Sequence, residues 1–381
     1  MCGFKVFRDP ESLGFSSKNL GKAYEILGQA VKEGRIMGAS IQVARSHGFL
    51  EPITFGRRGL EPDAPLVESN TIFLTASVTK PITATAVMKL IEDGKLCLRD
   101  HVTAIIPEFI GKWKEEVLVR HLLTHTSGLP DMLPENAELR RRHADLDEFL
   151  QRIYRVPLLF EPGTNISYQS CGFALLGEIV KRLTGIPLAE FMRQEIFKLL
   201  GMEDSSLGVD WRKVSQVSQV NIPKGSFEYG SLSDDWNWNS PYWWGFAAPW
   251  GGMFSTASDL TRFLMMFLNE GRLGSSRVLS PRTVRIMTSN QTILMPLIKD
   301  DVKRSNPWGL GWRLKAYCSL DWGFGDLASS RTFGHTGATG TMIWADPETN
   351  LACTVLTNQP DIDRCILSRF SNALVASVIE S

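Results

Sequence analysis

The sequence predicts an α+β protein in which an antiparallel sheet is flanked by helices and a mainly helical lobe is inserted into the chain. Strand-like segments lie near both ends of the chain, while helical periodicity dominates from about residue 105 to 215. The length of 381 residues exceeds what one hydrophobic core usually supports, so a second lobe is expected. We assign residues 1–104 and 245–381 to the sheet domain, and residues 105–244 to the helical lobe with its aromatic loop.

The first hundred residues carry both helix and strand signals. Apolar residues recur at helical spacing between residues 17 and 34, which predicts a first helix. Residues 39–56 predict two strands around a turn at Ser46-His47-Gly48. A second helix follows Ser77 and ends at Gly94, and its apolar stripe consists of Ile82, Ala86, Leu90 and Ile91.

The middle of the chain has helical patterns, which are followed by an aromatic segment without helical periodicity. The clearest helical patterns cover residues 115–130, 146–156, 171–185 and 188–202. Residues 221–252 instead form an aromatic loop rich in glycine and proline, and the stretch 234–250 holds five of the eleven tryptophans. This loop either packs on the core or forms an aromatic wall over a pocket, and the sequence favours neither alternative.

The last third of the chain returns to strands. Residues 256–271 predict a helix capped by Thr256 or Ser258. Four strands are then predicted over residues 309–317, 331–337, 339–346 and 350–358, with a hairpin turn at 346–350. A last helix covers residues 364–380. We therefore expect the N- and C-terminal parts to share one antiparallel sheet.

Composition excludes several classes of protein. Lys+Arg and Asp+Glu both number 41, so no net charge favours nucleic acid or an anionic membrane. No run of 18 apolar residues predicts a membrane span, and the N-terminus lacks the apolar core of a signal peptide, so a cytoplasmic protein is expected. The six cysteines, which lack any C-x-x-C spacing, are expected to be reduced thiols without metal: Cys2, Cys97, Cys171, Cys318, Cys353 and Cys365. No cofactor is expected.

Ser77 and Lys80 are the first candidates for chemistry. At positions i and i+3 of a helix, their side chains share one face. A lysine in a dry pocket loses enough basicity to accept a serine proton, and a serine near a helix N-terminus places backbone N–H groups beside a developing oxyanion. On their own, a serine and a lysine at this spacing are more often exposed surface residues without a catalytic role. However, this pair lies between apolar segments, and no other Ser-x-x-Lys occurs in the chain.

Tyr168 and His335 bear on whether Ser77 and Lys80 form a catalytic site. Tyr168 follows a Pro-Gly turn and precedes a helix, so its hydroxyl either enters a cleft or packs in the core. His335 begins a His-Thr-Gly segment whose small residues let a backbone approach a ligand, although a lone histidine there is more often structural. His125 is expected to have a structural hydrogen-bonding role rather than act as a base.

The order of these motifs resembles that of the penicillin-recognising serine hydrolases, for which Ser-x-x-Lys is a signature. The sequence around these motifs is similar to that of the class C β-lactamase-related branch of serine hydrolases. This branch includes family VIII esterases, D-amino-acid peptidases and penicillin-binding-protein-like hydrolases. The resemblance covers residues 20–375 and rests on SVTKPIT, LLTHTSGLP, FEPGTNISYQSCGFALLGEIVKRLTG, LLGMEDS, WGGMFSTASDLTRFL and GHTGATG. It implies a β-lactamase/transpeptidase-like fold.

The resemblance also implies roles for individual residues. Ser77 would be acylated, Lys80 would take its proton, and Tyr168 would share base duty and protonate the leaving group. The sequence leaves open whether Lys80 or Tyr168 is the base. The oxyanion hole would consist of the backbone N–H groups of Ser77 and Ala338, and the implied substrate contacts are Ser170, His335, Thr336 and Gly337.

Two departures from the family pattern bear on the substrate. Ser170 stands where β-lactamases carry asparagine, and His335 stands where the last motif often begins with lysine. A histidine is largely neutral at pH 7, so a fixed cation for a β-lactam carboxylate is lost. We therefore expect hydrolysis of small esters or amides, with esterase activity ahead of D-amino-acid or DD-peptidase and weak β-lactamase activity. The alternative of another class is a non-catalytic ligand-binding module. The sequence leaves the oligomeric state open.

Overall fold

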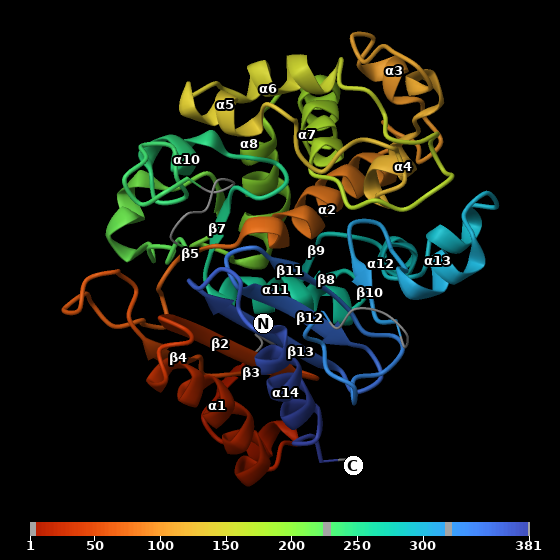
Figure 1. Ribbon diagram of the computed structural model, residues 1–381. Helices are drawn as coiled ribbons and strands as arrows, with labels where there is room; N and C mark the ends of the chain where they lie inside the picture. The colour runs from red at the N-terminus through yellow and green to blue at the C-terminus, as the bar shows by residue number, and fades with distance from the viewer. Residues whose placement is uncertain (1–4, 224–229, 317–321, 380–381) are drawn as a thin grey trace.

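The computed structural model describes residues 5–223, 230–316 and 322–379 and confirms the predicted fold class (Figure 1). A sheet lies at one end of the molecule, and most helices of the middle segment gather beyond it at the other end. The strands are β1 (Lys5–Phe7), β2 (Gly38–Arg45), β3 (Gly48–Leu50), β4 (Ile53–Gly56), β5 (Phe73–Leu74), β6 (Ser206–Leu207), β7 (Met253–Ser255), β8 (Arg272–Leu273), β9 (Ser276–Arg277), β10 (Arg313–Leu314), β11 (Phe333–Gly337), β12 (Thr341–Asp346) and β13 (Leu351–Thr357).

The main sheet joins the two ends of the chain. Its order is β1-β3-β2-β13-β12-β11-β10, with β4 also paired to β2. β2 and β13 are antiparallel neighbours along seven residue pairs, from Ala39 opposite Thr357 to Arg45 opposite Leu351. The predicted antiparallel character holds for the described pairs except β1–β3, which is parallel. The segment 39–56 forms three strands rather than the predicted two.

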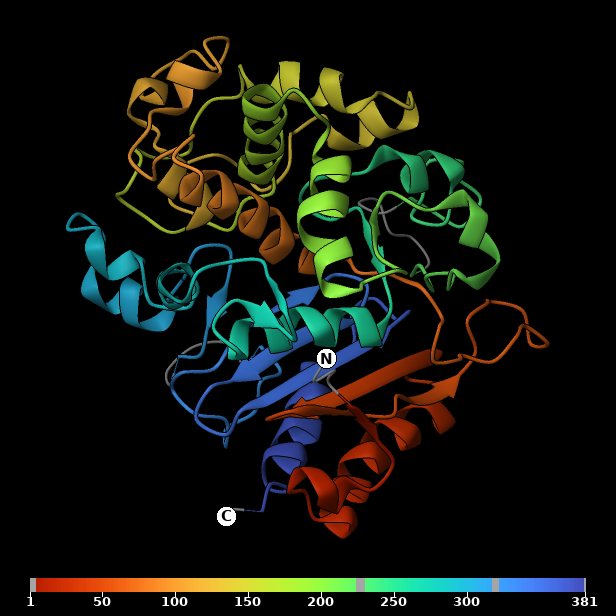
Figure 2. The ribbon, with the colours of Figure 1, turned by 180° about the vertical axis from the view of Figure 1, so that it is seen from behind.

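Helices cover both faces of this sheet. The helices are α1 (Ser17–Lys32), α2 (Thr79–Glu92), α3 (Val102–Ile105), α4 (Val119–Leu123), α5 (Asn136–Arg141), α6 (Leu146–Ile153), α7 (Cys171–Thr184), α8 (Leu188–Met192), α9 (Lys198–Leu200), α10 (Pro241–Phe246), α11 (Ala257–Leu268), α12 (Pro281–Met287), α13 (Asp300–Ser305) and α14 (Arg364–Val375). Helices α1 and α14 pack together on one face, and α11 packs on the other (Figure 2). Side chains alternate accordingly: Met342 and Trp344 face α1 and α14, while Ile343 and Ala345 join the core on the α11 side.

Several helical predictions are longer or shorter than the observed helices. Within residues 115–130 the α-helix covers only Val119–Leu123, because His125 adopts a left-handed φ of 59° that a helix cannot contain. Residues 188–200 form one helical run whose centre, Arg193–Phe197, is a π-helix. The aromatic segment predicted to be a loop contains α10, since Ser240 caps its N-terminus and Pro241 fits the first helical position. The predicted domain boundaries stay a prediction.

Thr256, rather than Ser258, caps α11, because its side chain accepts the Asp259 N–H. Cys97, Cys171, Cys353 and Cys365 are free thiols, while Cys2 and Cys318 lie outside the described residues. Within the described ranges, no helix combines the length and apolar character needed to cross a membrane.

Candidate active site

Ser77 lies where a short strand turns into a buried helix. β5 ends at Leu74, a 3-10 turn covers Ala76–Val78, and α2 continues from Thr79. Ala76 has a φ of 46°, a left-handed conformation that is unfavourable for a residue with a Cβ. Pro81 lies in the first turn of α2, where a missing N–H group costs little. The proline is therefore compatible with a regular α2 that carries Lys80 in its first turn, with Ser77 in the 3-10 turn directly before it.

The Lys80 side chain is completely buried beside Ser77. Its Nζ lies 3.1 Å from Ser77 Oγ, 3.2 Å from Ser170 Oγ and 3.0 Å from the Trp250 carbonyl oxygen. Burial lowers the pKa of Lys80 to about 7, and the nearby Asp131 carboxylate opposes this shift. At neutral pH, a large fraction of Lys80 is thus an uncharged amine within hydrogen-bonding distance of a serine hydroxyl.

Tyr168 lies on the other side of the same serine. It lines the same pocket as Ser77, and its ring lies under the Lys80 amine at 4.6 Å. The His125 ring stacks on Tyr168 at 4.6 Å, and its Nδ1 accepts the Gln169 N–H at 3.0 Å. Burial raises the pKa of the Tyr168 phenol well above its usual value, so the hydroxyl keeps its proton. His125 thus holds the tyrosine loop in place, which matches its predicted structural role.

The end of β11 is packed against the segment that precedes Ser77. Thr339 and Thr341 donate hydrogen bonds to the carbonyl oxygens of Leu74 (2.7 Å) and Thr75 (2.8 Å). A Cβ on Gly337 would lie 2.3 Å from the Thr75 carbonyl oxygen, so a glycine is needed for this close approach. These contacts bring Ala338 to the rim of the same pocket as Ser77.

A pocket of about 210 Å³ opens above Ser77 and unites most of the predicted residues. Ser77, Tyr168, Ser170 and Ala338 all line it, and Lys80 lies directly behind Ser77. The other lining residues are Asp131, Met132, Asn136, Arg140, Trp238, Trp243, Trp250 and Gly251. The two alternatives for the tryptophan-rich segment are therefore compatible, because Trp238, Trp243 and Trp250 are buried and also form a wall of this pocket.

His335, Thr336 and Gly337 lie on β11 immediately before Ala338, outside the residues that line the pocket. The His335 side chain is buried, and its Nδ1 lies 2.8 Å from the Thr336 carbonyl oxygen, so this nitrogen carries the proton. Burial, with Lys80 and Arg313 nearby, lowers the pKa of His335 well below its usual value. The ring is therefore neutral, and its role as a substrate contact stays a prediction.

Asp131 is a site residue that the sequence reasoning missed. Its Oδ1 accepts a hydrogen bond from Ser170 Oγ at 2.6 Å, and its backbone carbonyl oxygen accepts the N–H groups of Ser170 and Cys171. The available signal was its position directly after LLTHTSGLP, one of the family-like stretches. Its partner lies 39 residues away, a contact that no local pattern reveals.

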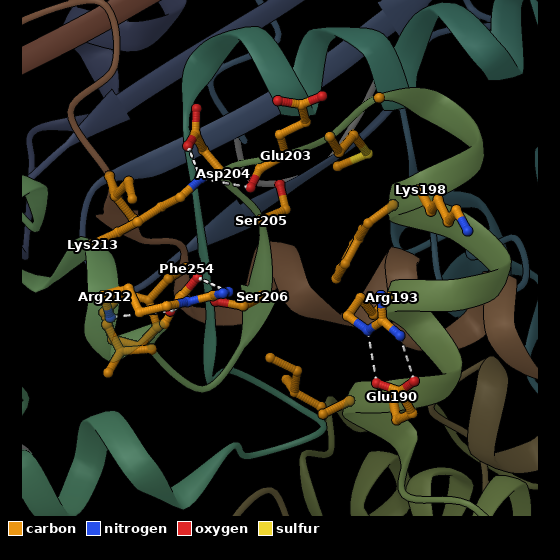
Figure 3. A pocket seen from close by; sticks show the side chains of 18 of the residues that line it. Glu190, Arg193, Lys198, Glu203, Asp204, Ser205, Ser206, Arg212, Lys213 and Phe254 are labelled. Carbon is orange, nitrogen blue, oxygen red and sulfur yellow. Dashed lines mark hydrogen bonds and ion pairs between the residues drawn. The ribbon is translucent and has the colours of Figure 1, made fainter.

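A larger cavity of about 650 Å³ lies away from Ser77, between the helical run 188–200 and the segment around β6 (Figure 3). Charged pairs such as Glu190–Arg193 and Asp204–Lys213 stand at its edge. Ser205 Oγ hydrogen-bonds with Asp259 and Ser255. In the described part of the chain, no lysine or histidine lies within hydrogen-bonding distance of this serine. Among the described residues, Ser205 therefore contacts a carboxylate and a hydroxyl, whereas Ser77 contacts the Lys80 amine.

Comparison with known proteins gives a family for the chain. A protein-family model described as Beta-lactamase matches residues 25–373, which is most of the chain. The chain belongs to the beta-lactamase family. The family consists of serine-acylating hydrolases and includes esterases and D-alanyl-D-alanine carboxypeptidases. The predicted resemblance is thereby confirmed at the level of the family.

Individual relatives of this beta-lactamase family member carry different names. It is 27% identical to an N-acetylmuramyl-L-alanine amidase of Bacillus subtilis, over 92% of its own length and 83% of the relative. It is 26% identical to a candidate D-alanyl-D-alanine carboxypeptidase of Escherichia coli O157:H7, over 92% of its length and 85% of the relative.

Solved structures share the fold of this beta-lactamase family member. A penicillin-binding protein homologue from Caulobacter crescentus superposes with a TM-score of 0.79 at 20% identity, covering 96% of this chain and 99% of the other. A family VIII carboxylesterase superposes with a TM-score of 0.74 at 22% identity, covering 94% and 98%. At these identities, the likeness shows the fold alone.

Proposed function

We propose that the protein is a serine hydrolase that cleaves small esters or amides through a Ser77 acyl-enzyme, with carboxylic esters as the preferred substrates. The observation that carries this proposal is the 3.1 Å contact between Ser77 Oγ and the buried Lys80 amine. A serine needs a base within hydrogen-bonding distance to become a nucleophile, and a lysine with a pKa of about 7 is such a base at neutral pH.

The proposed reaction has two stages. In the first, Ser77 Oγ bonds to the substrate carbonyl carbon as its proton passes to Lys80 Nζ, and the carbonyl electrons move onto oxygen. The backbone N–H groups of Ser77 and Ala338 would stabilise this oxyanion. When the carbon–oxygen bond re-forms, the leaving group departs with a proton supplied through Tyr168. In the second stage, water attacks the acyl-enzyme by the same route and releases the acid.

The pocket and its lining favour small esters. A volume of about 210 Å³ is below the usual 300–1,000 Å³ of drug-sized ligand sites, so short acyl groups are expected. Its wall of Trp238, Trp243 and Trp250 suits an apolar group. The neutral His335 offers no fixed cation for a β-lactam carboxylate. A second candidate is a D-alanyl carboxypeptidase, which is favoured by the names of the Escherichia coli relatives.

The testing experiment compares substrates and traps the acyl-enzyme. p-Nitrophenyl acetate, butyrate and decanoate, a chromogenic cephalosporin and a D-alanyl-D-alanine peptide are each assayed with purified protein. We expect the acetate and butyrate esters to turn over faster than the decanoate and the cephalosporin. A fluorophosphonate should add one adduct, which peptide mass spectrometry should assign to Ser77. An adduct on another residue would refute the proposed nucleophile, and turnover of the peptide alone would favour the carboxypeptidase.

The pH dependence of ester hydrolysis should report Lys80. Protonated Lys80 cannot accept the Ser77 proton, so kcat/KM should rise with pH through about 7 and then level off. At pH 5 it should be roughly a hundredfold below the plateau, because a single ionisation costs tenfold per pH unit. Burial lowers the pKa values of His125 and His335, which keeps both neutral in this range. A profile that is flat from pH 5 to 9 would contradict Lys80 as the base.

A further inference from the structure

Asp131 takes no part in the proposed reaction, yet its carboxylate lies beside groups that do take part in it. It lines the pocket with Ser77 and Ser170, and its Oδ1 lies 2.6 Å from Ser170 Oγ. Ser170 Oγ in turn lies 3.2 Å from Lys80 Nζ, so the three groups form one chain of hydrogen bonds that ends at the base. Ser170 and Lys80 are both buried, while Asp131 is open to solvent at the pocket.

The protons in this chain can be assigned by the capacity of each group. An ionised carboxylate only accepts hydrogen bonds, and a serine hydroxyl has one proton to give. Ser170 therefore donates that proton to Asp131, and its oxygen faces Lys80 as an acceptor. The Trp250 carbonyl, 3.0 Å from Lys80 Nζ, is a second acceptor and cannot donate.

These two acceptors fix the orientation of the neutral amine. An uncharged amine has two N–H groups and one lone pair, and both N–H groups are taken by Ser170 and Trp250. The remaining direction is that of Ser77 Oγ, at 3.1 Å. When Lys80 is protonated, its third N–H points at Ser77; when it is neutral, the lone pair does. The base thus becomes competent by losing one proton, with no movement of heavy atoms.

We propose that Asp131 is a positioning residue that fixes the hydroxyl proton of Ser170 and thereby aims the lone pair of Lys80 at Ser77. The inference rests on the proposed function and identifies Lys80, rather than Tyr168, as the group that takes the serine proton. It also accounts for Ser170 where β-lactamases carry asparagine: an amide oxygen accepts from lysine by itself, whereas a hydroxyl needs Asp131 to make it an acceptor.

Removal of Asp131 should therefore have two separable effects. Without its acceptor, the Ser170 hydroxyl can rotate and donate to the Lys80 lone pair, in competition with Ser77. In addition, a negative charge that favours protonated Lys80 is lost, so the acid limb of the pH profile should move to lower pH. The other titratable or charged groups that face Lys80 stay in place: Tyr168, Cys171, Arg313, His125 and His335.

The test measures kcat/KM for p-nitrophenyl acetate from pH 5 to 9 in matched variants. Asp131→Ala should lower the alkaline plateau by about 10- to 100-fold, the scale of a misaligned base. Asp131→Asn should lose less, because its amide oxygen can still accept from Ser170, and its acid limb should also move to lower pH. Combining Asp131→Ala with Ser170→Asn should recover much of the plateau, since the new amide oxygen can accept from Lys80 directly.

The controls separate this inference from a general structural effect. Asp147→Ala removes an exposed carboxylate of α6 that pairs only with surface Lys181 in the described structure, and it should leave the profile unchanged. Equal losses in Asp131→Ala and Asp131→Asn without any shift of the acid limb would overturn the proposal, as would a wild-type profile in Asp131→Ala. Thermal unfolding identifies any variant that does not fold, and Asp131→Asn then carries the test.

A failure of the proposed function would give different kinetics from a failure of the positioning role of Asp131. If Ser77→Ala retained full ester turnover, the serine hydrolase mechanism itself would be wrong. If Ser77→Ala were inactive while both Asp131 variants kept the wild-type plateau and acid limb, only the positioning role would be wrong. The two results are read from the same assay with the same substrate.

Discussion

Replacing Ser77 with alanine is expected to lower kcat for p-nitrophenyl acetate by about 10⁴- to 10⁶-fold, the scale found when a serine nucleophile is removed. The hydroxyl oxygen is the atom that would become acylated. Its neighbours are not expected to replace it, because Tyr168 keeps its proton, Ser170 donates its hydroxyl proton to Asp131, and Lys80 is enclosed by Ser170 and Trp250. The residual rate should come from binding and oxyanion stabilisation. Steady-state kinetics and loss of the fluorophosphonate adduct measure the effect.

Lys80→Met should lower kcat for p-nitrophenyl acetate nearly as much as Ser77→Ala does. The double variant Ser77→Ala/Lys80→Met should have a kcat no lower than that of either single variant. Nucleophile and base act as a unit, so their losses do not add. Methionine fills the buried space without leaving a charge unpaired. Lys181→Met on the exposed side of α7 is the matched control and should keep wild-type activity. A Lys80→Met protein with more than about a hundredth of wild-type kcat would assign the base to another group.

Trp312→Ala should lower the free energy of unfolding by about 3–5 kcal/mol, as expected for a large aromatic side chain removed from a packed core. The indole is fully buried, and its ring centroid lies 5.0 Å from those of both Phe267 and Phe333 and 5.9 Å from that of Phe263. The cluster joins α11 to β11, so the cavity would lie between helix and sheet. Urea denaturation followed by circular dichroism measures the change.

Trp312→Phe provides the matched comparison. Phenylalanine keeps most of the apolar volume and removes an indole N–H that has no hydrogen-bond partner among the described residues. Relief of that buried donor offsets part of the lost packing, so the variant should lose much less stability than Trp312→Ala. Equal losses in both variants would show that shape, rather than volume, governs this cluster.

The local features of the fold could be read from the sequence because their causes are local. The helix at residues 17–34 and the hairpin turn at 346–350 follow from apolar spacing and turn chemistry, and both are found where they were expected. The helix predicted over 115–130 was too long, because the left-handed His125 is stabilised by Gln169, far along the chain. A window of neighbouring residues contains no trace of that contact.

The same distinction between local and distant causes applies to the candidate site. Ser77 and Lys80 are one helical turn apart, so their contact was predictable from spacing alone. Tyr168 and Ala338 were placed only through the resemblance to a family. Asp131 was missed because its importance arises from Ser170, a partner that folding brings to it. The sequence thus pointed to groups that the structure brings together around Ser77, and their roles stay a prediction, whereas the group proposed to orient them needed the structure.

The pairing of β2 with β13 has a consequence for how the protein is made. At translation speeds of about 5–20 residues per second, the ribosome needs roughly 15–60 s to synthesise the segment that separates Ala39 from its partner Thr357. During that interval, β2 presents an apolar, unpaired edge. Chaperone capacity and slow low-temperature expression, rather than final stability, should therefore decide the yield of native protein in a foreign host.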